Sequence, residues 1–140
     1  MAREYRPNIR EASVISRLDH AKEARKLEAL QQLRLNLDLL SSRIAMKLIE
    51  ERLIETNSKL DLEEQIYNCL KGLITAEDFD IQYKIANIRT LVPRPNFISL
   101  YLTAFIIEDL INHPCIVDIY GTDEEIYRCV NEQIFKVIKV

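Results

Sequence analysis

The chain has 140 residues and carries 19 basic and 22 acidic side chains, for a formal net charge of −3. This length suits one domain whose core needs no disulfide or metal ion to hold it together. Only two glycines, Gly72 and Gly121, are present, which excludes phosphate-binding loops built on several glycines. The balanced charge gives no reason to expect bulk attraction to nucleic acid or to an anionic membrane.

A long helix is predicted near the N-terminus, preceded by a flexible arm at residues 1–7. Asn8 and Glu11 have the spacing of an N-cap and its reciprocal acceptor, and no Gly or Pro follows up to Thr56. An unbroken helix of about 47 residues would reach ~70 Å, about twice the width of a compact chain of this length. The helix therefore either breaks, with Ser41-Ser42 as the expected place, or protrudes and needs a partner.

This predicted helix is apolar on two sides. At 100° per residue, one stripe consists of Leu30, Leu33, Leu37, Leu40, Ile44 and Leu48. The opposite stripe consists of Leu35, Leu39, Met46, Ile49 and Leu53. A helix on the surface of a domain needs one apolar stripe, so the second stripe predicts a contact with another chain. The alternation of leucines from 33 to 39 also fits a strand, but strong helix formers surround it and β-branched residues are lacking.

Four shorter helices are predicted after residue 56 from their capping residues. Three begin at the capping pairs Asp61 with Glu64, Thr75 with Asp78, and Thr122 with Glu125. Gly72 is the expected end of the first of these helices. Pro93 and Pro95 stop the second, because neither can donate a backbone hydrogen bond.

The fourth helix runs from Phe97 to about Asn112 with Asn96 as its cap, and it is apolar nearly all round, which places it at the centre of the core. Residues 115–120 have strand composition and predict an extended connector, a short helical turn or an edge strand that pairs with another copy. The predicted fold is all-α, with five to six helices in a single domain over residues 1–140. Its long N-terminal helix packs on a bundle of shorter helices, with one short extended segment at 115–120.

Candidate reactive side chains are few. The densest group consists of His113, Cys115, Asp118, Tyr120 and Asp123, with Cys129 in the next helix. These residues lack the paired spacing of a zinc site, and the acidic residues at 61–64 and 77–80 suit the first turns of helices. We therefore predict no catalytic residue, cofactor or metal; a small enzyme with a site near His113 is one alternative. The odd number of cysteines without a CxxC pair predicts reduced thiols.

The first 34 residues carry eight basic side chains against five acidic ones. Arg10, Arg17, Arg25 and Lys26 could contact nucleic acid through phosphate groups. Acidic residues interrupt this stretch, so a continuous basic face is not predicted. A nucleic-acid-associated regulator is the second alternative.

The sequence does not identify a function directly. Its surplus apolar stripe predicts a helical assembly or adaptor module that acts through protein–protein contacts, as a homo-oligomer or as a small subunit of a larger complex. The most apolar run, residues 97–107, is shorter than the ~20 residues of a membrane helix. The N-terminal residues lack the apolar centre of a signal peptide, so a cytoplasmic location without membrane contact is expected.

Overall fold

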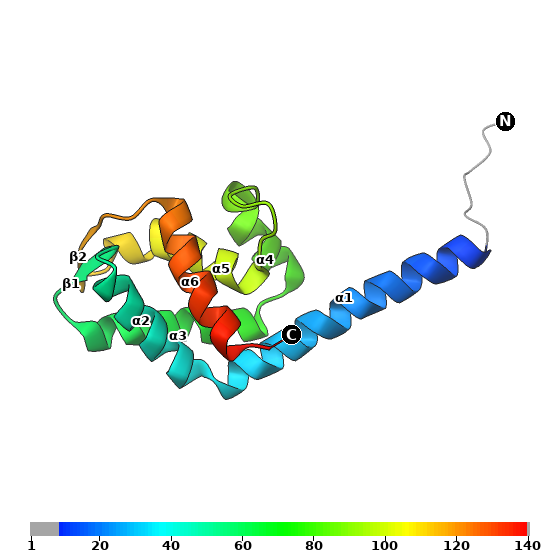
Figure 1. The fold of residues 1–140 in the computed structure, drawn as a ribbon, viewed down its shortest axis with the longest axis horizontal. Helices are drawn as coiled ribbons and strands as arrows, with labels where there is room; N and C mark the ends of the chain where they lie inside the picture. The colour runs from blue at the N-terminus through cyan, green and yellow to red at the C-terminus, as the bar shows by residue number, and fades with distance from the viewer. Residues whose placement is uncertain (1–8, 140) are drawn as a thin grey trace.

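The computed structural model describes the backbone of residues 9–139 and the side chains of residues 21–139. Figure 1 shows the helices gathered into one body from which the N-terminal part of the first helix projects. The longer helices are α1 (Ile9–Leu35), α2 (Leu37–Glu50), α3 (Lys59–Thr75), α4 (Asp78–Ile85), α5 (Phe97–Glu108) and α6 (Asp123–Val137). Shorter elements are the 3₁₀ turns η1 (Ala86–Ile88) and η2 (Leu110–Asn112) and the strands β1 (Ile54–Thr56) and β2 (Ile116–Ile119). The predicted all-α class is confirmed.

The predicted break in the first helix occurs at Asn36 and not at Ser41-Ser42. Asn36 leaves helical geometry, with φ −124° and ψ 21°, and its side-chain amide donates to the Gln32 carbonyl at 2.7 Å. The Ser41 hydroxyl donates to the Leu37 carbonyl at 2.6 Å, four residues back within α2. Both polar side chains can compete with the backbone for hydrogen bonds, but the helix continues through Ser41 and ends at Asn36.

The prediction of helix up to residue 56 is wrong. α2 ends at Glu50, Arg52 has a left-handed φ of 59°, and β1 follows. β1 pairs antiparallel with β2 inside the same chain, so the extended segment at 115–120 does not need another copy. The Thr56 hydroxyl donates to the Cys115 carbonyl at 2.6 Å, and the Tyr120 hydroxyl donates to the Glu55 carboxylate at 2.7 Å.

The predicted caps after residue 56 are confirmed at two helices and shifted at two others, whereas the predicted cap at Asn8 and the arm at residues 1–7 lie outside the residues that the structure describes. Asn96 accepts hydrogen bonds from two backbone amides of α5, and Thr122 and Glu125 form a complete capping box. α3 begins two residues before Asp61, with Ser58 as its cap, and continues past the predicted end to Thr75. α4 has Glu77 at its N-cap position without a side-chain capping bond, so the Thr75 cap is wrong.

α5 lies at the centre of the packing, as its composition predicts. Its residues Ile98, Leu102 and Ile106 are fully buried in the main core. Leu100 and Ala104, on another side, form a second cluster with the buried Tyr127 of α6. Apolar contacts on both sides therefore explain why α5 has no polar stripe. None of the described helices is both long and apolar enough to span a bilayer.

We predict that Gly121→Ala destabilises the fold by about 1–2 kcal/mol, because overpacking a filled core forces its side chains to shift. A Cβ atom there would lie 2.7 Å from Leu53 Cδ2 and 3.2 Å from Ile126 Cγ1. Gly72→Ala is the matched control, since nothing lies within 4 Å of its added Cβ. It should stabilise α3 by about 0.5–1 kcal/mol. Urea unfolding followed by circular dichroism measures both; equal effects would contradict the packing argument.

Candidate protein-interaction surfaces

Three large apolar side chains are exposed where α1 ends and along α2. Leu35 is 77% exposed, Leu39 48% and Met46 40%. We call these three residues the Leu39 face. The opposite stripe of the same two helices is fully buried at Leu33, Leu40, Ile44 and Leu48. Among the described residues, therefore, the first stripe is buried at these four positions, whereas the second stripe is exposed at the Leu39 face.

Two other residues of the predicted interface lie elsewhere. Ile49 is partly buried and packs against the main core. Leu53 is only 6% exposed and contacts the turn at Gly121, so it belongs to the core. The helical spacing that grouped it with Leu39 does not apply, because α2 ends at Glu50.

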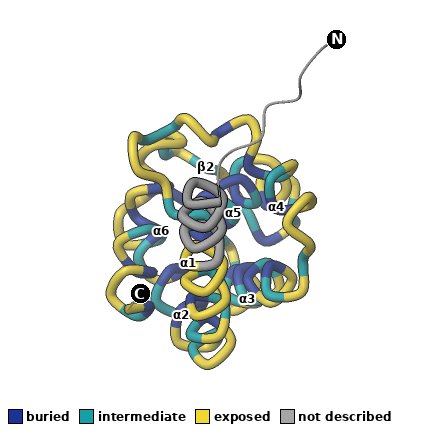
Figure 2. Tube along the Cα trace, turned by 90° about the vertical axis from the view of Figure 1, so that its right-hand side faces the viewer, coloured by how far each residue is buried: buried dark blue, intermediate teal, exposed yellow. Residues whose placement is uncertain are grey.

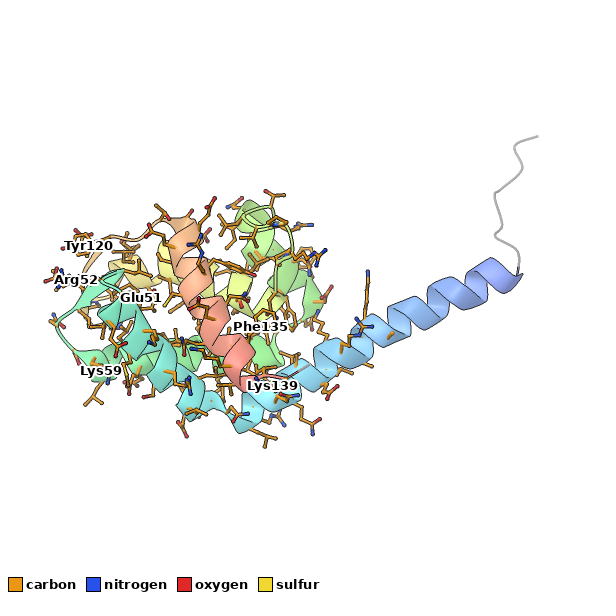
Figure 3. All side chains as sticks on the ribbon, in the orientation of Figure 1. Glu51, Arg52, Lys59, Tyr120, Phe135 and Lys139 are labelled. Carbon is orange, nitrogen blue, oxygen red and sulfur yellow. The ribbon has the colours of Figure 1, made fainter. Side chains whose placement is uncertain are left out.

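A groove of about 550 Å³ separates the second half of α1 from α4, the start of α5 and the end of α6. We call it the α1 groove. The side chains that line it include Lys22, Arg25, Lys26, Phe97, Phe135 and Ile138. Figure 2 looks toward α1 with α6 on one side of it and α4 on the other. Figure 3 shows Phe135 on α6, and Lys139 where the end of the chain meets α1. This surface was not predicted, because its walls come from three distant parts of the sequence.

The charges in the α1 groove are unevenly compensated. Lys26 forms an ion pair with Asp78 of α4, and its Nζ lies 5.5 Å from the centroid of the Phe97 ring. The hydrogen bond from Lys26, together with its positive charge, lowers the pKa of the Asp78 carboxyl. Lys22 and Arg25 form no ion pair with any other side chain in residues 21–139. Within this described part of the chain, the rim thus carries two positive charges without an ion-pair partner.

The base of α1 is fixed to the end of the chain by a two-point contact. The Gln32 side-chain nitrogen donates to the Lys139 carbonyl at 3.0 Å. The Lys139 backbone amide donates to the Gln32 side-chain oxygen at 2.8 Å. Together with the Lys26–Asp78 ion pair, this contact positions the α1 wall of the groove before any partner binds.

The residues predicted as nucleic-acid contacts divide into two groups. Arg25 and Lys26 line the α1 groove. The side chains of Arg10 and Arg17 lie outside the residues that the structure describes. The acidic first turn of α4 supplies Asp78, which pairs with Lys26. This arrangement is not a uniformly basic surface.

The side chain of His113 makes a hydrogen bond to the backbone of the turn before β2. His113 Nδ1 accepts a hydrogen bond from the Cys115 amide at 3.1 Å. Burial raises the pKa of the Cys115 thiol, and it raises that of Cys129 from 9.0 to about 12. Among the residues described, no three His, Cys, Asp or Glu side chains are placed to hold a metal ion. In the described structure, His113 thus stabilises the backbone of the turn before β2.

No protein-family model, no curated protein and no solved structure matches this chain. The Leu39 face and the α1 groove are therefore interpreted from their own chemistry.

We predict that the three cysteines react slowly with a disulfide reagent in the folded chain at pH 8. Only the thiolate reacts, and raising the pKa of Cys129 from 9.0 to about 12 lowers its thiolate fraction roughly a thousandfold. Burial raises the pKa of Cys69 as well. Thiol titration with and without 6 M guanidinium checks this expectation. Rapid reaction of one thiol in the folded chain would instead favour a nucleophilic cysteine.

Proposed function

We propose that the chain is a helical assembly module that associates with a second copy through the Leu39 face. The observation that carries the proposal is the contrast in burial along α1 and α2. Leu39 and Met46 are 48% and 40% exposed, whereas Leu40 and Ile44 on the same helix are fully buried. Exposed apolar side chains grouped on one surface are typical of protein–protein contacts.

The spacing on α2 supports pairing with an identical helix. Leu39 and Met46 are two helical turns apart, and the small side chain of Ser42 lies between them on the same side of the helix. With a two-fold axis beside Ser42, antiparallel α2 helices would place Leu39 of each copy against Met46 of the other. Such an interface is self-complementary and closes at two copies.

The energy available is moderate. Covering the exposed parts of the three side chains contributes about 2–5 kcal/mol per copy, and association costs at least about 4 kcal/mol in lost freedom of motion. The expected dissociation constant is therefore micromolar or weaker, and the dimer must be looked for over a range of concentrations.

We predict that Leu39→Asp abolishes dimerisation while leaving the fold intact, because the new charge would be buried at the contact without a partner. Light scattering coupled to size-exclusion chromatography, at loading concentrations from about 10 to 500 μM, should show the wild-type mass rising from 16.4 kDa toward twice that value. The mass of Leu39→Asp should stay at the monomer value. Salt should have little effect on the wild-type dimer, because the contact is apolar.

Ile111→Asp is the matched control, because Ile111 is 47% exposed but lies in η2. Its mass should follow that of the wild type. A wild-type chain that stays monomeric at every concentration, or a Leu39→Asp chain that still dimerises, would reject the proposal.

A further inference from the structure

The α1 groove carries positive charges at its rim and apolar side chains on its floor. Its rim carries Lys22 and Arg25, which have no ion-pair partner among the side chains of residues 21–139. Its third cation, Lys26, is already neutralised by Asp78. Among the described side chains, the α1 side of the groove therefore carries two positive charges without an ion-pair partner.

The floor and the α6 wall of the groove are apolar. Phe97 is half-buried, Ile138 is 6% exposed, and Phe135 is 55% exposed. Aromatic side chains in a partly desolvated pocket are typical anchor points of protein interfaces. A ligand that carried only negative charge would leave this apolar surface uncovered.

α4, which contributes Gln82 to the groove, also carries two exposed aromatic side chains. Phe79 and Tyr83 are 77% and 78% exposed, and their rings stack with centroids 6.5 Å apart. They follow directly after Asp78 and Gln82 in the sequence, and Gln82 lines the groove. Because neighbouring residues do not share a helix face, these two rings lie on a different side of α4 from Gln82.

The charge pattern favours a protein over a nucleic acid. Asp78 at the start of α4 is exposed and pairs with Lys26 of α1, so the phosphates of a strand running along this side of α1 would approach a carboxylate beside the two cations. A peptide can place its acidic side chains on the α1 side alone and its apolar side chains on the floor. An amphipathic helix separates the two kinds of side chain in this way.

We propose that the α1 groove binds an acidic amphipathic helical segment of a partner protein. Acidic side chains of the segment pair with Lys22 and Arg25, and its apolar side chains cover Phe97 and Phe135. The groove is fixed in advance by the Gln32–Lys139 contact, which reduces the entropy lost on binding. This surface is separate from the Leu39 face, so the proposal stands without the dimer.

The test uses two fluorescent 15-residue peptides that share one Leu/Phe helical face and carry either Glu or Lys on the other. Fluorescence anisotropy with the full chain should show at least about tenfold tighter binding of the Glu peptide, and added salt should reduce this preference. The Lys22→Glu/Arg25→Glu variant should reverse the preference. Phe135→Ser should weaken the binding of the Glu peptide at least about fivefold, since part of the apolar floor is lost.

Arg34→Glu/Lys71→Glu is the matched control, because both side chains are exposed, lie outside the groove and change the net charge equally. It should keep the preference of the wild type. Equal binding of the two peptides, or no saturable binding of the Glu peptide up to 1 mM, would overturn the proposal. Loss of preference in the control as well would show that overall charge, not the groove, selects the peptide.

Two other occupants of the groove give distinct results. Tight binding of a 20-nucleotide single-stranded RNA without binding of the Glu peptide would assign the groove to nucleic acid. A mass in solution that falls in Lys22→Glu/Arg25→Glu but not in Leu39→Asp would assign it to a second copy of the chain. Either result would overturn the proposal, and only the second would also contradict the proposed role of the Leu39 face.

Discussion

The interruption at Asn36 is the constraint on which the rest of the structure depends. From Ile9 to Glu50 an unbroken helix would be about 60 Å long at 1.5 Å per residue, far longer than a body built from helices of 8–17 residues. Because Asn36 ends α1, α2 can follow a different direction and bury Leu40, Ile44 and Leu48 in the body. The same interruption leaves the N-terminal part of α1 projecting from it (Figure 1).

Gln32 connects this interruption to the other end of the chain. Its carbonyl accepts the Asn36 side-chain amide, and its side chain makes both hydrogen bonds to the Lys139 backbone. The direction of α1 is therefore set by contacts on two sides, together with the buried Ala29 and Leu33. A helix positioned in this way can form one wall of a groove with constant geometry.

The sequence predicts the local features of this fold well and the distant ones poorly. The caps at Asn96 and at Thr122 with Glu125 could be read directly, because a cap depends on residues within one helical turn. Strand β1 could not be read, because its three residues gain their partner only through pairing with β2, about 60 positions later. The prediction that Leu53 shares a face with Leu39 is wrong, because the helix that would set this spacing ends at Glu50.

The two candidate surfaces differ in how much of each could be foreseen. The exposure of Leu35, Leu39 and Met46 follows from a helix pair with more apolar surface than one core can cover, and periodicity reveals that excess. The α1 groove depends on the distances of α4 and α6 from α1, and no sequence pattern predicts those distances. Lys22 and Arg25 could be recognised as basic residues, but Phe97 and Phe135 become their neighbours only in the folded chain.

The position of the two surfaces follows from the geometry at Asn36. Leu35 immediately precedes the interruption and Leu39 follows it by one turn, so the Leu39 face spans the junction of α1 and α2. The groove begins at Ala29, less than two turns before the junction. A straight helix would carry both surfaces away from the body, without α4 and α6 to complete the groove. The interruption at Asn36 thus lies between a surface suited to self-association and one suited to an acidic partner.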